Sequence, residues 1–215
     1  MTELRICFVG DSITNGTSDN ECQGWPGRLC GAERTNGHDI TQYNLGIRAE
    51  TSEQIADRWR AECTPRLPEP YPSALVFSFG VNDMAEENGQ IRVPQERSLE
   101  IARHMITQAK EWLPVLWIGP SPVNDEKQPF VSSPVKSCFF STERLIDLSA
   151  AYRALADELQ IPYLELMKPL LANDQWTAAL LAGDGVHPTG DGYAVIARMI
   201  GDWPAWRAWM DQRPA

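Results

Sequence analysis

Residues 6–16 read ICFVGDSITNG, an apolar run that stops at a glycine and is followed two residues later by a serine. The run begins at residue 4, is short and ends before Gly10, which is typical of a buried strand. Gly10 permits a sharp turn at the carboxyl end of this strand, where open α/β sheets bind their ligands. The hydroxyl of Ser12 would therefore face a substrate, although a serine that only caps a helix has the same local signature.

Short apolar segments alternate with amphipathic segments along the rest of the chain. The predicted strands are residues 4–9, 40–45, 74–79, 115–118 and 161–166. The predicted helices begin near residues 24 and 51, follow Pro94, cover 145–159, and begin again near residue 193. This alternation predicts an α/β protein with a three-layer α/β/α architecture and a mostly parallel five-stranded sheet. No repeat or linker interrupts it, so we expect a single domain over residues 1–215.

Two connections are predicted to be loops, a polar one at residues 84–93 and a long irregular one at residues 119–141. The second contains four prolines and follows a strand, so it can overhang the end of the sheet. Loops of this length in a compact domain are often functional. We expect this loop to set substrate choice, with Lys127 meeting an anionic substrate and three aromatic residues forming the wall of an acyl pocket: Phe130, Phe139 and Phe140.

Composition narrows the classes of partner. The formal net charge of −10 argues against binding nucleic acid or an anionic membrane surface by bulk electrostatics. The five cysteines are odd in number and contain no C-x-x-C pair, so neither a disulfide framework nor a zinc site is expected. No apolar run reaches the roughly 18 residues of a membrane helix, and the amino-terminal residues do not resemble a signal peptide. The expectation is a cytoplasmic protein without a membrane span.

A nucleophilic serine needs a base, and the chain has only three histidines. His38 lies in a polar turn and His104 on a predicted helix. His187 lies in a glycine-flanked turn, three residues after Asp184, whose carboxylate can accept a hydrogen bond from one ring nitrogen. The other nitrogen would then be free to take the proton of Ser12, which is the logic of a serine triad. Taken alone, the same turn could equally contain a histidine with a purely structural role.

The attacked carbonyl also needs hydrogen-bond donors for its developing negative charge. The backbone N–H groups of Ser12 and Gly46 and the side-chain amide of Asn82 are suitable. Each follows a predicted strand, and right-handed crossovers bring the carboxyl ends of parallel strands to one edge of the sheet. Turn formation explains Gly46 or Asn82 singly, but it does not explain all of these residues together.

Four short blocks in this order resemble the SGNH hydrolase superfamily, the GDSL-type esterases and lipases. The blocks are GDS at residues 10–12, NLG at 44–46, GVND at 80–83 and DGVHP at 184–188. The resemblance implies a flavodoxin-like fold, with Ser12 as nucleophile, His187 as base and Asp184 as its orienting acid. It also implies an oxyanion hole formed by Ser12, Gly46 and Asn82. The reaction would be hydrolysis of a small-molecule ester through an acyl-serine intermediate, without a metal or organic cofactor.

The chain departs from the family pattern at two positions. Ile13 stands where the family name has leucine, which is a conservative change. Ala49 stands where the second block often has another glycine. The second departure could narrow or rigidify the loop, but we do not expect it to touch a catalytic atom.

One segment of the chain also fits a different class of function. Residues 12–17, after a first strand, resemble the phosphate-binding loop of a flavodoxin-like protein, which would make the chain a non-catalytic flavin- or anion-binding module. Such a module leaves His187 and Asn82 unexplained. A non-catalytic carbohydrate- or acyl-binding relative is a third alternative, against which the complete catalytic set argues.

Tryptophans recur every three residues near the carboxyl terminus, at Trp203, Trp206 and Trp209. The spacing predicts a helical stripe packed on the body of the domain. An exposed stripe would indicate a dimer surface instead, so a homo-oligomer stays open as an alternative to a monomer.

Overall fold

The protein, described here from a computed structural model covering residues 3–133 and 136–210, is built on a five-stranded parallel sheet. The strands are β1 (Leu4–Gly10), β2 (Ile40–Gly46), β3 (Ser73–Ser78), β6 (Val115–Ile118) and β9 (Tyr163–Leu164). Their spatial order is β2-β1-β3-β6-β9, and every neighbouring pair is parallel. This is the flavodoxin-like order, so the predicted fold class is confirmed.

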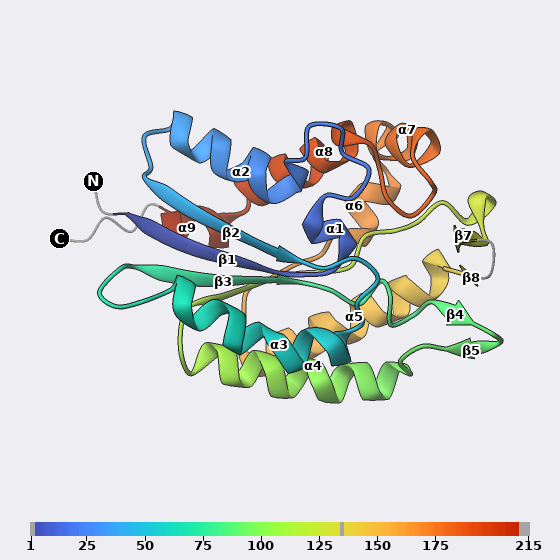
Figure 1. Ribbon diagram of the computed structural model, residues 1–215, viewed down its shortest axis with the longest axis horizontal. Coiled ribbons are helices and arrows are strands. Elements are labelled where there is room, and N and C mark those ends of the chain that lie inside the picture. The colour runs from blue at the N-terminus through green and yellow to red at the C-terminus, as the bar shows by residue number, and fades with distance from the viewer. Residues whose placement is uncertain (1–2, 134–135, 211–215) are drawn as a thin grey trace.

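Helices cover both faces of the sheet (Figure 1). One layer contains α2 (Gly24–Thr35), α6 (Met167–Leu171), α7 (Asp174–Ala182), α8 (Gly190–Gly201) and α9 (Pro204–Met210), and the other contains α3 (Ser52–Cys63), α4 (Gln95–Lys110) and α5 (Thr142–Leu159). Alternate residues of β1 point to opposite faces: Ile6 and Phe8 join the core beneath the first layer, and Cys7 and Val9 join the core beneath the second.

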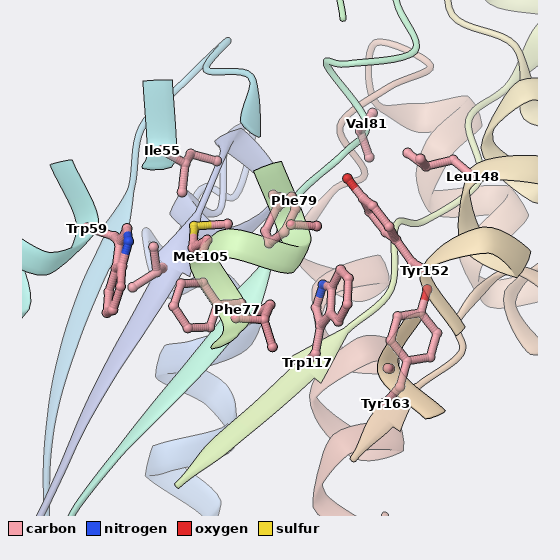
Figure 2. Packing of buried hydrophobic residues seen from close by; sticks show 14 of the residues in the cluster. Ile55, Trp59, Phe77, Phe79, Val81, Met105, Trp117, Leu148, Tyr152 and Tyr163 are labelled. Carbon is pink, nitrogen blue, oxygen red and sulfur yellow. The ribbon is translucent and has the colours of Figure 1, made fainter. Parts of the chain in front are cut away.

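The core on the α3–α5 side is rich in aromatic side chains (Figure 2). The Trp117 ring stacks on Phe79 at a centroid distance of 5.6 Å and meets Tyr152 at 4.7 Å. Offset and edge contacts of this kind add to the stabilisation that burial alone provides. The residues after β3 therefore leave the sheet over a closely packed support.

The fifth strand is shorter than predicted. Only Tyr163 and Leu164 pair with the neighbouring strand, at Trp117 and Ile118. Pro162 before them has no N–H to donate, and the chain turns into α6 almost immediately after them. The prediction of a strand over 161–166 was thus right about its place and wrong about its length.

The two predicted loops contain hairpins. Residues 84–93 include β4 (Glu86–Glu87) and β5 (Gln90–Ile91), joined by Asn88 and Gly89, both at positive φ. Residues 119–141 contain the short helix η2 (Asp125–Lys127) and the hairpin of β7 (Phe130–Ser133) and β8 (Lys136–Cys138). A bridge between Glu86 and Phe139 joins the two hairpins beyond the carboxyl edge of the sheet (Figure 1). The prediction of irregular loops was wrong here.

The remaining elements are the short helices α1 (Ser12–Asn15) and η1 (Thr64–Arg66). No element was predicted for residues 167–182, between β9 and the turn of His187, but α6 and α7 occupy most of them. Among the described residues, no helix has both the length and the apolar character needed to span a membrane.

The tryptophan stripe packs on the body of the domain, as predicted. Trp206 is fully buried on α9, and its indole N–H donates to Glu33 Oε1 at 2.9 Å. Trp203, which precedes α9, and Trp209 are partly buried against the same core.

Candidate active site

The turn after β1 holds Ser12 at the carboxyl edge of the sheet. The helix α1 begins at Ser12, and Asp11 caps it by accepting a hydrogen bond from the Ile13 N–H at 2.9 Å. A Cβ on Gly10 would lie 2.1 Å from the carbonyl oxygen of Ser78 in the neighbouring strand. Any side chain at this position would clash with β3. Gly10 therefore allows β1 to end against β3, with Ser12 two residues beyond at the edge of the sheet.

A second turn, after α7, brings His187 to Ser12. His187 Nε2 lies 2.7 Å from Ser12 Oγ, and Nδ1 lies 2.8 Å from Asp184 Oδ2. The other carboxylate oxygen, Oδ1, accepts the N–H groups of Val186 and His187 at 2.9 and 2.7 Å. Only 4% of Ser12 and 5% of His187 are exposed. Three residues that were predicted to act together are thus joined in series, because His187 lies within hydrogen-bond distance of both Ser12 and Asp184.

The electrostatics of this group favour an ionised Asp184. Partial burial raises the pKa of Asp184, but the hydrogen bond and charge of His187, together with the two backbone N–H bonds, outweigh burial and hold that pKa below its usual value. A carboxylate at Nδ1 keeps the proton on that nitrogen and leaves Nε2 free to accept the Ser12 proton.

The segment 124–130 packs against the turn that carries Asp184. The Lys127 ammonium donates to the carbonyls of Leu181 and Gly183, the latter at 2.9 Å. A cation at this position is favourable because the last carbonyls of a helix lack partners and carry partial negative charge. The expectation that Lys127 meets an anionic substrate was therefore wrong: its amino group is occupied at the end of α7.

The three phenylalanines of the long connection have different environments. The ring of Phe130 meets the His187 ring edge-on at 5.7 Å, and it also packs against Phe140, which is buried. Phe139 is 43% exposed and lies under the guanidinium of Arg144. Of the three, only Phe130 is seen in contact with the Ser12–His187 pair in the part of the chain that the structure describes.

The turn after β3 directs Asn82 toward the loop after β2. One N–H of its amide donates to the Glu50 carbonyl at 2.9 Å, which leaves the second N–H for another acceptor. Gly46 is different, because its N–H donates to Asn44 Oδ1 at 3.0 Å. A Cβ on Gly46 would lie 2.2 Å from the backbone nitrogen of Asn15. The close packing of Gly46 against α1 is thus sufficient to explain why this residue is glycine. A role in binding an oxyanion is not needed for that explanation.

Comparison with known proteins identifies the family. Residues 8–195, most of the chain, match the model of the GDSL-like lipase/acylhydrolase family. The chain belongs to this family. It is 28% identical over 207 residues to an isoamyl acetate-hydrolyzing esterase of Saccharomyces cerevisiae, with 89% of this chain and 82% of that protein covered.

Solved structures of similar fold include a lipase/acylhydrolase from Enterococcus faecalis, with a TM-score of 0.74, 20% identity and 94% of each chain covered. Another is Axe2, an acetylxylan esterase from Geobacillus stearothermophilus, with a TM-score of 0.70, 16% identity, and 97% of this chain and 94% of that chain covered. At such identities the likeness shows the fold alone. Family membership makes the chain a carboxylic ester hydrolase and favours this function over a flavin- or anion-binding module.

The second departure from the family pattern has a structural consequence. Ala49 has a φ of 64°, the left-handed region that favours glycine. Arg92 donates to the Ala49 carbonyl at 2.8 Å and so helps to fix this conformation. Within the described residues, the N–H groups of Ser12 and Ala49 have no protein acceptor. The sequence analysis expected position 49 to leave the catalytic atoms untouched. The glycine that the family often has here was the signal for this backbone conformation.

The other two histidines have partners other than Ser12. His38 Nε2 is 3.6 Å from Glu33 Oε2, and His104 is exposed on α4 beside Gln108. Across residues 3–133 and 136–210, no group of three or more His, Cys, Asp or Glu side chains is arranged to hold a metal ion.

Proposed function

We propose that the protein hydrolyses a carboxylic ester through an acyl-serine intermediate, with Ser12 as nucleophile, His187 as base and Asp184 as orienting acid. The observation that carries the proposal is the hydrogen-bonded series from Asp184 Oδ2 through the His187 ring to Ser12 Oγ, at 2.8 and 2.7 Å. Ser12 Oγ attacks the ester carbonyl while Nε2 takes its proton. The imidazolium then gives this proton to the departing alcohol, and a water molecule repeats the sequence on the acyl-serine.

The proposed oxyanion hole consists of the Ser12 N–H, the second N–H of Asn82 and one backbone N–H of the loop after β2. Gly46 serves as this third donor only if Asn44 releases its N–H. Ala49 is the favoured donor, because its N–H has no acceptor among the described residues and Asn82 is bonded to the adjacent residue, Glu50. Backbone donors of this kind stabilise the charge that develops on the carbonyl oxygen.

The proposed substrate is a small ester with a short acyl group. The support is the curated relative, an isoamyl acetate-hydrolyzing esterase, which is similar over most of both chains. The Phe130 ring adds an apolar surface beside His187, where the alcohol part of an ester would leave.

The test is hydrolysis of p-nitrophenyl esters from acetate to octanoate by the wild type and Ser12→Ala, with fluorophosphonate labelling alongside. We expect kcat/KM to fall with chain length in the wild type, and Ser12→Ala to lose both the label and at least about 10³-fold in kcat. Ser137→Ala, at an exposed serine of β8, is the matched control and should keep both. Activity that persists in Ser12→Ala would place the nucleophile elsewhere.

A further inference from the structure

Asp83 follows Asn82 directly and is a fully buried carboxylate that the proposed chemistry does not use. Its Oδ1 accepts the Ser52 N–H at 2.7 Å, and its Oδ2 accepts the Ser98 hydroxyl at 2.5 Å. The Ser98 oxygen is in turn 2.5 Å from the hydroxyl of Tyr152. Ser52, Ser98 and Tyr152 are also fully buried, and they come from α3, α4 and α5.

Two adjacent side chains therefore bind the same short stretch of backbone. Asn82 donates to the carbonyl of Glu50, and Asp83 accepts the N–H of Ser52. These bonds fix the turn after β3 to the loop after β2 from both sides of Thr51, the cap of α3. Both of these segments carry proposed oxyanion donors, so their relative position decides the geometry of the oxyanion hole.

The chemistry of Asp83 gives this arrangement a direction. The Ser98 hydroxyl donates to Asp83 Oδ2, so its oxygen is free to accept the proton of the Tyr152 hydroxyl. Hydrogen bonds in such a series strengthen one another in a low-dielectric core. Burial raises the pKa of Asp83, and the hydrogen bonds from Ser52 and Ser98 offset part of the cost of burying this carboxyl group. The same series joins α3, α4 and α5 to the turn after β3, so it fixes the position of that turn.

The far end of the series is held by the aromatic core. Tyr152 lies beside Trp117, and its hydroxyl points toward Val81, the residue before Asn82 (Figure 2). Gly80 packs so closely on this ring that an added Cβ would be 2.9 Å from it. Tyr152 therefore fixes the position of the turn after β3 relative to the aromatic core.

We propose that Asp83, Ser98 and Tyr152 are positioning residues that hold the Asn82 amide where the oxyanion forms. The inference rests on the proposed function, since it requires Asn82 to be a donor. Such donors must lie within about 2.7–3.1 Å of the oxyanion rather than of the ground-state carbonyl. Removing one hydrogen bond from the Asp83–Ser98–Tyr152 series should therefore lower kcat and leave KM nearly unchanged.

The first experiment compares Tyr152→Phe and Ser98→Ala with a matched control, Tyr163→Phe. Tyr163 belongs to the same core and its hydroxyl is 3.0 Å from Ser149 Oγ, but this pair does not reach Asp83. With p-nitrophenyl acetate we expect kcat to fall about 5- to 20-fold in both test variants, with KM within about twofold, and to stay within about twofold in the control. Equal losses in Tyr152→Phe and Tyr163→Phe would overturn the proposal. If Ser98→Ala fails to fold, Tyr152→Phe, which removes one oxygen, carries the test.

The second experiment combines Tyr152→Phe with Asn82→Ala. If Tyr152 acts through Asn82, Tyr152→Phe should change kcat by less than about twofold once the amide is absent. Losses that multiply would show a structural role only and overturn the inference. An unchanged kcat in Asn82→Ala alone would also overturn it, whereas failure of the proposed hydrolysis is seen separately, as activity that survives in Ser12→Ala.

Discussion

The candidate site at the carboxyl edge of the sheet lies between two parts of the chain, here called walls, that are built differently. The first wall consists of the turns after β1, β2 and β3. Glycines allow close packing in these turns, and side-chain hydrogen bonds fix the position of each turn. The second wall consists of the segment 124–130 and the turn after α7. Its contacts cross large distances in the chain, as between Lys127 and the carbonyls of Leu181 and Gly183, 54 and 56 residues away.

The two walls hold different parts of the proposed chemistry. The first carries the nucleophile and the donors that stabilise negative charge on the substrate. The second carries the acid–base pair of Asp184 and His187. Damage to the first wall should thus lower the rate at every pH, and damage to the second should act through proton transfer.

The largest effect is expected in the first wall, from Asn82→Ala. Loss of one oxyanion donor typically costs about 10²–10³ in kcat, and we expect this loss for p-nitrophenyl acetate with little change in KM. The shape of the pH–rate profile between pH 5 and 9 should not change, because this substitution leaves His187 and Asp184 in place. Asn36→Ala, at an exposed asparagine after α2, is the control. A loss below about tenfold would show that other groups stabilise the oxyanion.

In the second wall, Lys127→Met should have a smaller effect, about tenfold in kcat. Methionine keeps the stem that packs on Gly185 but removes the ammonium that holds the end of α7, and small displacements of catalytic groups are costly. Lys110→Met is the matched control, because Lys110 also donates to a carbonyl at the end of a helix, Leu159 at 2.7 Å, but belongs to α4. Both variants should lose similar stability, and only Lys127→Met should lose activity. Equal kcat values in Lys127→Met and Lys110→Met would show that Lys127 does not position the catalytic groups.

The same contrast explains how far the sequence could predict the structure. Ser12, Asn82 and His187 could be placed because glycines and short polar blocks mark the ends of elements, and these signals are local. The hairpin at residues 84–93 also had a local signal, the dipeptide Asn88-Gly89, but strands of two residues show no alternation.

The hydrogen bonds of Lys127 had no local signal in the sequence, because its partners lie at the end of α7, a helix that was not predicted. The bond from the Gly46 N–H to Asn44 depends on a side-chain rotamer, which the identity of the two residues does not specify. Sequence patterns therefore located the chemical groups of the site, while the availability of each donor was decided by contacts that form only in the folded chain.

The smallest expected effect concerns two carboxylates, one in each wall, with opposite pKa shifts. Burial raises the pKa of Asp11 to about 7, against the Ile13 N–H and the charge of His187, whereas the pKa of Asp184 is lowered. Folding therefore favours the protonated form of Asp11, and its contribution to stability is lost as pH rises from about 4 to 7. The contribution of Asp184 is present above about pH 4 and is lost as pH falls through its lowered pKa.

Thermal unfolding of Asp11→Asn and Asp184→Asn between pH 3 and 8 tests this contrast. Asparagine at position 11 keeps an acceptor for the Ile13 N–H but cannot ionise, so the melting temperature of this variant should rise by several °C relative to the wild type between pH 4 and 7. One pKa unit corresponds to about 1.4 kcal/mol, and about 1 kcal/mol shifts the melting temperature by about 2–4 °C in a chain of this size. Asp184→Asn should instead lose stability above pH 4 and approach the wild type in acid, by a smaller amount because solvent reaches this side chain. Slopes of the same sign in both variants would contradict the opposite environments of the two walls.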